Sequence, residues 1–239
     1  MSSLPLVAQP AISQGRISEI LDGSEVYIQN TLARVNDVAN RGQQVRTGVA
    51  RTQVNFNTGA VARLSRHSVL TIGQCAQLQR GVLLVNGAVN GCTSSVTAGV
   101  RGTTYILEVD ETGQEQIKVL EGEVIVTKQP EAEQPGDSPQ ATPAIPATPA
   151  TAEAETVTLS AGQKIATRKG QRLGEPVNLT VEEFLAILNG DLFRSYVEQL
   201  PGLANIRSVF QRLYPGVPFP LSVPSLPIPR IPRPRLPFF

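Results

Sequence analysis

The sequence predicts an all-β main domain of many short antiparallel strands, arranged as a β-roll or sandwich, with a small C-terminal α-helical segment and a disordered proline-rich tail. Three observations support this fold class. Residues 16–126 hold short runs rich in Val, Ile, Leu and Thr, separated by Gly, Asn and Asp, as strands and tight turns are. Helical patterns begin only beyond residue 176, and ten of the 19 prolines lie from Pro201 onward.

The expected strands are short and closely spaced. Residues 52–56 alternate polar and apolar side chains, Thr58-Gly59 supplies a turn, and residues 61–64 continue beyond it. Each run offers one apolar face, and many such faces can cover one another only in a sandwich, barrel or stacked roll. Further strands are expected at residues 69–72, 82–85, 105–109, 117–120 and 124–126. No helical pattern separates them, which disfavours a doubly wound nucleotide-binding fold.

Composition divides the chain into six segments. Residues 129–155 carry Pro, Ala, Thr and five acidic residues but no Lys or Arg, so they cannot bury enough apolar surface to offset the entropy of ordering. The predicted segments are a flexible N-terminus (1–14), a β domain (15–128), a disordered insertion (129–155), a closing β-hairpin (156–175), a helical segment (177–214) and a proline-rich tail (215–239).

A first helix is predicted to begin at Thr180. Thr180 and Glu183 have the spacing of a capping box, and Leu179 and Phe184 that of a hydrophobic staple. The helix is expected to end near residue 189, where Asn-Gly follows.

Two more helical runs are predicted at residues 191–199 and 205–213. The second run places four apolar side chains on one face, namely Ile206, Val209, Phe210 and Leu213. We expect the helices to cap an end of the β domain, and docking on a partner is the alternative.

Cys75 and Cys92 are predicted to form a disulfide. They enclose an expected strand at residues 78–85 and the dipeptide Asn86-Gly87, and Asn-Gly is the strongest short hairpin signal. The chain should therefore double back and bring the two thiols together. Such a bridge stabilises by about 3 kcal/mol in the chain-entropy model and requires an oxidising compartment. Two free thiols in a cytosolic protein are the alternative.

Charge and residue counts exclude several function classes. With 21 Lys and Arg against 20 Asp and Glu, the chain has no large basic field for nucleic acid. One His and two Cys are too few for a His-rich metal site, a zinc ribbon or a Cys/His nucleophile, so no metal or other cofactor is expected. The sequence has no apolar run near the roughly 18 residues of a transmembrane helix. Residues 4–11 resemble the end of a signal peptide, and a floppy terminus is the alternative.

Several motifs resemble, in order and spacing, those of the FecR domain family. In the first half they are QVRTG (44–48), VNFNTGAVARL (54–64) and SVLTI (68–72). In the second half they are LQRG (78–81), VTA (96–98), VRGTTY (100–105), VLEGEV (119–124) and VTLSAGQKI (157–165). The last motif makes residues 129–155 an insertion within the domain.

The resemblance implies an all-β periplasmic module, best known as the sensing half of regulators of extracytoplasmic sigma factors in iron uptake. Such regulators carry an anti-sigma segment and a membrane helix before the domain, whereas fewer than twenty residues precede Arg16. We therefore expect a module that binds or scaffolds. The residues that match the family signature, and are expected to be structural, are Gly48, Gly59, Gly81, Arg101, Gly102, Thr103, Gly122 and Gly162.

Three features have alternative functional interpretations. Arg101 could bind an anion, but a lone Arg beside Gly usually makes a structural contact. Glu121 and Glu123 could suggest a catalytic carboxylate pair, but Gly122 places them around a turn rather than across a cleft. His67 is expected in an exposed polar turn.

The C-terminal tail could bind an acidic partner, because a polyproline chain loses little entropy on binding. Its candidate residues are Arg230, Arg233 and Arg235. A solvated tail without a partner is the alternative.

The sequence thus predicts a non-catalytic, periplasmic or secreted FecR-like module that binds an envelope protein or glycan of unknown identity, with a signal peptide trimmed or missing. The alternative is a periplasmic sensor subunit in sigma-factor signalling that acts through a separate membrane partner. An enzyme is not expected, because no nucleophile, base and orienting group can be assembled from the sequence.

Overall fold

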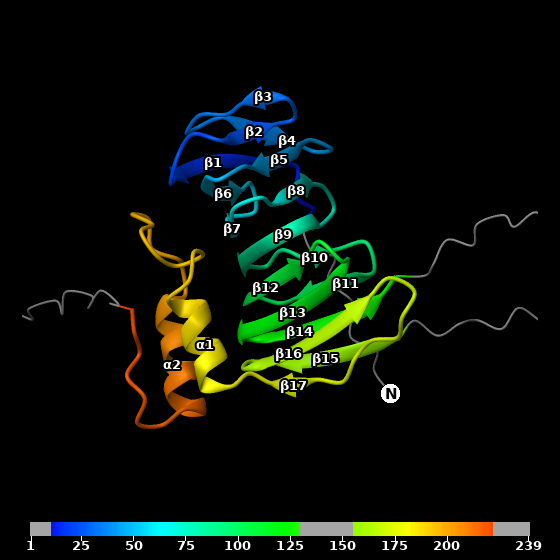
Figure 1. The fold of residues 1–239 in the computed structure, drawn as a ribbon, viewed down its shortest axis with the longest axis vertical. Helices are drawn as coiled ribbons and strands as arrows, with labels where there is room; N and C mark the ends of the chain where they lie inside the picture. Colours follow the sequence, from blue (N-terminus) through cyan, green and yellow to red (C-terminus); the bar gives the residue numbers. More distant parts are fainter. Residues whose placement is uncertain (1–10, 130–154, 222–239) are drawn as a thin grey trace, which may run out of the picture.

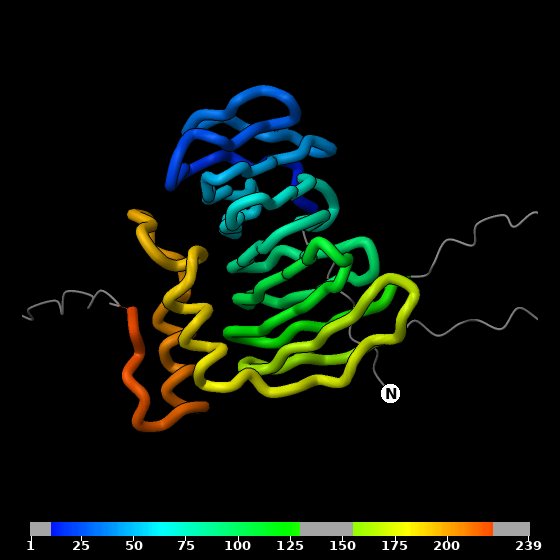
Figure 2. The backbone as a smooth tube through the Cα atoms, in the orientation of Figure 1, coloured from blue at the N-terminus to red at the C-terminus, as the bar shows by residue number. Residues whose placement is uncertain are grey.

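A computed structural model of the protein describes residues 11–129 and 155–221. These residues form 17 β-strands and two C-terminal α-helices, which confirms the predicted all-β main domain with a C-terminal helical segment (Figure 1). The predicted disordered insertion and proline-rich tail lie largely outside the described residues. All strands belong to one connected set of hydrogen-bonded pairs, which folds into two layers, sheet A and sheet B. The tube view in Figure 2 shows the strands stacked as successive rungs, with the helices along one side.

Sheet A has nine strands, and every pair in it is antiparallel. In spatial order they are β4 (Val38–Asn40), β1 (Gln14–Leu21), β6 (Arg51–Phe56), β7 (Val61–Leu64), β9 (Ala76–Gly87), β12 (Thr103–Val109), β13 (Gln114–Glu121), β16 (Gln163–Arg168) and β17 (Val177–Asn178).

Sheet B also has nine strands, because it shares β9 with sheet A. In spatial order they are β3 (Thr31–Leu32), β2 (Val26–Ile28), β5 (Gln44–Thr47), β8 (Val69–Ile72), β9, β10 (Gly91–Cys92), β11 (Val96–Val100), β14 (Glu123–Lys128) and β15 (Thr156–Ser160). The pair β9–β10 is parallel, and the other pairs described in this sheet are antiparallel.

The long strand β9 connects the two layers. Its first half pairs with β8 and β10 in sheet B, and its second half pairs with β7 and β12 in sheet A. Gly81 lies between the halves with a φ of 90°, a conformation that only Gly adopts without strain. The expected strand at residues 82–85 is therefore part of a longer strand that turns from one layer into the other.

The main core lies between the layers. Alternate residues of each strand point into it, for example Val54 of β6, Leu78 and Val85 of β9, and Val124 of β14, all of which are fully buried. The hydroxyl of Tyr105 donates a hydrogen bond to the Val89 carbonyl at 2.8 Å inside this core. Burial of these faces supplies the main driving force for the two-layer arrangement.

A second apolar core lies between sheet A and the helices α1 (Val181–Leu188) and α2 (Leu203–Leu213). It contains Leu84 of β9 and Ile106 of β12 from the outer face of the sheet, together with Phe184 and Phe210 from the helices. The two Phe rings meet edge to face with centroids 5.4 Å apart. The expectation of an end cap is therefore wrong, because the helices cover a face of sheet A.

The first helix begins as predicted. Thr180 is the N-cap of α1, and the capping box with Glu183 is complete, since each side chain accepts from the other residue's backbone N–H at 3.2 and 3.0 Å. The helix predicted at residues 191–199 is wrong. That segment has turns at residues 191–195 and irregular backbone from 196 to 199, and Ser195 has a φ of 67°, which a right-handed helix cannot contain.

The last predicted helix corresponds to α2, which begins two residues earlier than expected, after Gly202. Its buried residues include Ile206, Val209 and Phe210. Leu213, assigned to the same face, is 39% exposed.

The predicted disulfide between Cys75 and Cys92 is present, with Cα atoms 5.9 Å apart. The expected reason was wrong, because Asn86 lies within β9, paired with Val61 and Thr104, rather than in a hairpin turn. The cysteines meet because β10 returns parallel to the start of β9, with Cys92 opposite Gln77.

Strands β15 and β16 follow the stretch of residues 130–154 that lies outside the described chain. They pair with β14 and β13, respectively, both of which precede that stretch. The strands before and after that stretch are therefore hydrogen-bonded to each other in both sheet A and sheet B.

Candidate functional site

Two adjoining cavities lie on the outer face of sheet A, and residues of α1 line the second of them. Their volumes are about 390 Å³ and about 450 Å³, and they share the lining residues Ser65, Val82 and Glu108. We call the two cavities together the α1 groove. Volumes of this size are common for ligand sites, so the groove is the candidate functional site.

The first cavity is lined by residues of both charges. Arg66 comes from the turn at residues 65–68 and Arg80 from β9, whereas Asp110 and Glu111 come from the turn between β12 and β13. Hydrogen bonds from the Thr112 hydroxyl and from the backbone of Gln114 hold the pKa of Asp110 below its ordinary value. Asp110 is therefore an anion at neutral pH.

The second cavity has an apolar floor. Val82, Ile106 and Ile187 line it from β9, β12 and α1. Two ion pairs lie beside these apolar residues. Lys118 Nζ lies 2.6 Å from Glu108 Oε1, and Lys164 pairs with Glu183. The bond from Lys164, with the backbone bond from Thr180, lowers the pKa of Glu183.

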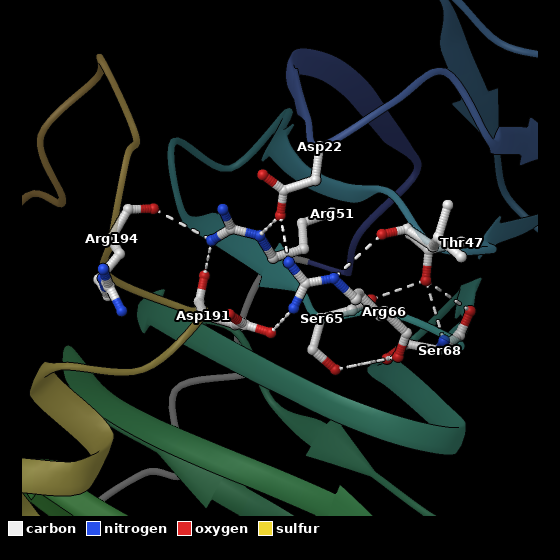
Figure 3. Close-up of polar contacts among 9 residues, drawn as sticks. Asp22, Thr47, Arg51, Ser65, Arg66, Ser68, Asp191 and Arg194 are labelled. Carbon is white, nitrogen blue, oxygen red and sulfur yellow. Dashed lines mark hydrogen bonds and ion pairs between the residues drawn. The ribbon is translucent and has the colours of Figure 1, made fainter.

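A network of arginine and aspartate side chains links lining residues of the two cavities (Figure 3). Asp22, from the turn after β1, accepts from Arg51 Nε at 2.6 Å and from Arg66 Nη2 at 2.5 Å. Arg66 also pairs with Asp191, a residue of the second cavity. The hydrogen bond from Arg51 is the main cause that lowers the pKa of Asp22. The network thus joins the β domain to the segment that follows α1.

The turn at residues 65–68 is fixed by its neighbours. The Thr47 hydroxyl donates to the Ser65 carbonyl at 2.7 Å, and the Thr47 backbone N–H donates to the Ser68 carbonyl at 3.0 Å. Gly81 lies directly against the turn, where a Cβ atom would come within 2.7 Å of Ser68 Cα. Since such a contact cannot form, Gly81 is required for the turn to approach β9. The exposed His67 lies in this turn, as expected, and lines the first cavity.

Two buried arginines dock the segment 190–200 onto sheet A. Arg63 is 2% exposed and donates to the Leu192 carbonyl at 3.0 Å and to the Glu198 carbonyl at 2.6 Å. Arg51, equally buried, donates to the Arg194 carbonyl at 3.0 Å. Burial lowers the pKa of Arg63 to about 10. The charged groups of Arg51 and Arg63 therefore attach the C-terminal segment to sheet A.

The other residues assigned to the family signature lie in turns or at strand ends, and their assignment stays a prediction. Gly122 packs on Thr103, the first residue of β12, since a Cβ atom at Gly122 would lie 2.5 Å from Thr103 Cγ2. Gly48 follows β5, Gly59 joins β6 to β7, Arg101 and Gly102 join β11 to β12, and Gly162 joins β15 to β16. Arg230, Arg233 and Arg235 lie outside the described residues.

The carboxylates considered for catalysis are placed apart from the groove lining. Glu121 ends β13 and accepts a hydrogen bond from the Thr104 hydroxyl at 3.3 Å. Glu123 is exposed at the start of β14, and Gly122 between them has a φ of 84°. In the described ranges, 11–129 and 155–221, there is no group of three or more His, Cys, Asp or Glu placed to hold a metal ion.

Sequence reasoning missed the groove and its supporting arginines. It also missed Glu115, which is 1% exposed and accepts from the Ser94 hydroxyl at 2.9 Å and the Ser95 hydroxyl at 3.1 Å. Arg63 within an apolar strand was the one available signal. Its partners lie far along the chain, so no local pattern could have identified them.

No protein-family model and no curated protein match the chain. Two crystal structures of a protein named as an anti-sigma factor, from Parabacteroides distasonis ATCC 8503, match with a TM-score of 0.43 and 15% identity. The matches cover 62% of this chain and 65% or 64% of the other. The chain thus matches less than two thirds of their length. In the described part of the chain, neither helix is long and apolar enough to cross a membrane.

Proposed function

We propose that the protein is a non-catalytic, FecR-like module of the periplasm or cell exterior that binds a polypeptide segment of an envelope protein in the α1 groove. The observation that carries the proposal is the groove itself, with its apolar floor and its rim of both charges. An apolar floor gives affinity, while charges at the rim select the partner and its orientation.

The rim charges support a polypeptide ligand with both signs. Arg80 offers positive charge, and Asp110 and Glu111 offer negative charge. Asp110 is held in its turn by three hydrogen bonds from Thr112 and Gln114 at 2.8 to 2.9 Å. Side chains that are ordered before binding lose less entropy when a partner arrives.

The hydrogen bonds of Ser65, which lines both cavities, support a role without catalysis. The Ser65 hydroxyl lies 3.0 Å from the Ser68 hydroxyl and 3.2 Å from the Arg66 carbonyl. A nucleophilic serine needs a base within hydrogen-bond reach, whereas these partners are a hydroxyl and a carbonyl. The bridge between Cys75 and Cys92 supports the proposed compartment, because disulfides persist in oxidising surroundings.

The alternative function is that of a sensor subunit in sigma-factor signalling. In that case the groove would receive a segment of a separate membrane protein, and binding would change transcription. The identity of the bound protein separates the two proposals, since a membrane regulator supports signalling and a structural envelope protein supports scaffolding.

Site-specific photo-crosslinking in the native host tests groove binding. A photoreactive residue would replace Glu111, which is exposed and lines the first cavity, and in a control it would replace Arg207, which is exposed on α2. We expect one discrete adduct with an envelope polypeptide from position 111 and none from position 207. No adduct at position 111, or the same adducts at both positions, would contradict the proposal.

A further inference from the structure

A row of uncharged hydrogen-bonding side chains crosses sheet B. The register places Gln44 opposite Thr71, and Thr71 opposite Gln77. Beyond Cys92, the register continues from Thr97 to Thr127 and on to Thr156. Seven adjacent strands therefore contribute one position each, and the row spans about 29 Å at about 4.8 Å per strand. We call these six Gln and Thr residues the sheet B row.

The side chains of the sheet B row face away from the core. Their neighbours along the strands point into the core and are fully buried, as Val45, Ala76, Ala98 and Val126 illustrate. Since alternate residues of a strand point to opposite faces, the row lies on the outer face of sheet B. The helices pack on sheet A, so they do not cover this face.

Hydrogen bonds order several of these side chains before any ligand binds. Gln44 Nε2 donates to Gln79 Oε1 at 3.2 Å, and Gln79 Nε2 donates to Thr71 Oγ1 at 3.2 Å. Near the other end of the row, Gln129 Nε2 donates to Thr97 Oγ1 at 3.2 Å. This ordering lowers the entropic cost of binding a ligand along the row.

We propose that the sheet B row binds a neutral polysaccharide that lies across the strands. Amide and hydroxyl groups both donate and accept hydrogen bonds, which matches sugar hydroxyl and acetamide groups. The repeat from strand to strand suits a polymer of repeating sugars rather than a single small molecule. Ile125, two residues before Thr127 in β14, is 47% exposed on the same outer face and offers an apolar surface for the faces of sugar rings.

The chemistry of the row disfavours two other ligands. Its six side chains carry no charge, so an anionic polymer would find no opposite charge along it. Protein interfaces usually depend on buried Trp, Tyr or Arg anchors, and the row contains none of these types. The inference concerns the opposite layer from the α1 groove and does not depend on it.

Adsorption of the full chain to insoluble chitin and cellulose tests the proposal. We expect the protein to be retained on at least one of these neutral polymers, with little change when salt is added. The double variant Gln44→Glu, Gln77→Glu keeps side-chain shape but introduces charge, and it should bind about tenfold more weakly. The control Gln211→Glu introduces the same charge on the exposed part of α2 and should bind like the parent.

Retention on neither polymer would overturn the inference, provided that circular dichroism shows the parent to be folded. Equal weakening by Gln211→Glu, or loss of retention on adding salt, would overturn it as well. The photo-crosslinking result at Glu111 is independent of all these outcomes.

Discussion

The guanidinium group of Arg63 lies over the ring of Tyr196, 3.9 Å from the ring centroid. Arg63 belongs to β7 and Tyr196 to the turn segment between the helices, so the contact joins the β domain to the C-terminal segment. Arg63 Nε also donates to Gln53 Oε1 at 2.8 Å. The buried arginine thus satisfies partners on both sides of one interface.

Replacing Arg63 should detach the segment 190–200. In Arg63→Met, the Leu192 carbonyl, the Glu198 carbonyl and Gln53 lose their donor, and we expect the free energy of unfolding to fall by about 3 kcal/mol. Arg207→Met, on the exposed side of α2, should change it by less than about 0.5 kcal/mol. Hydrogen exchange should show faster exchange at residues 190–200 in Arg63→Met alone. Equal exchange in both variants would contradict the role of Arg63.

Alkaline pH should destabilise the fold through buried phenols. Burial raises the pKa of Tyr196 to about 12 and raises the pKa of Tyr105 and Tyr214. A raised native pKa gives stability that is complete below the unfolded value of about 10 and is lost as the pH rises. Arg63 acts in the opposite direction, since its native pKa of about 10 is below the ordinary value.

Phenolate absorbance measures this effect directly. Of the four tyrosines, Tyr105 and Tyr196 should stay protonated at about pH 11 in the folded protein, whereas all four should titrate near pH 10 after denaturation. Tyr196→Phe should remove one late-titrating phenol. A folded protein whose phenols all titrate near pH 10 would contradict the burial of these two rings.

The disulfide should stabilise the exported protein. Material from the periplasm should contain no titratable thiol when denatured, and reduction should lower the melting temperature because the unfolded chain loses a constraint worth at most about 3 kcal/mol. The double variant Cys75→Ser, Cys92→Ser should not respond to reductant. Two reactive thiols per chain in exported protein would argue against the bridge and against the proposed compartment.

Neither Glu121 nor Glu123 should be needed for any reaction. Glu121→Gln and Glu123→Gln should each change the free energy of unfolding by no more than about 1 kcal/mol. Incubation with cell-wall polymers should give the same products, if any, for both variants and for the parent. If a defined hydrolytic activity of the parent disappeared in either folded variant, the protein would be an enzyme.

Local patterns were sufficient for much of the fold. The turn at Thr58-Gly59 joins β6 to β7, and the capping box at Thr180 starts α1, because both depend on residues close in sequence. The Asn86-Gly87 signal failed because pairing with β7 and β12 kept the pair inside β9. Tertiary contacts there outweighed a strong local preference.

The candidate sites could not be predicted from local sequence patterns, because they also depend on contacts between distant parts of the chain. Arg51 and Arg63 are charged residues in short strands, where such side chains usually face solvent, yet the segment 190–200 covers them. Only the folded chain reveals which distant segment satisfies their charges. The sheet B row likewise depends on strand register, which single strands do not specify.

The central claim is that a partner binds in the α1 groove. Its most direct test is the yield of the crosslinked adduct at position 111 in two tryptophan variants. Ala186 is exposed on α1 and lines the second cavity, whereas Ala204 is exposed on α2 and lines neither cavity. Ala186→Trp should fill the groove and abolish the adduct, and Ala204→Trp should leave its yield unchanged, with both proteins folded by circular dichroism. An adduct that persists in Ala186→Trp, or that falls equally in both variants, would contradict binding in the groove.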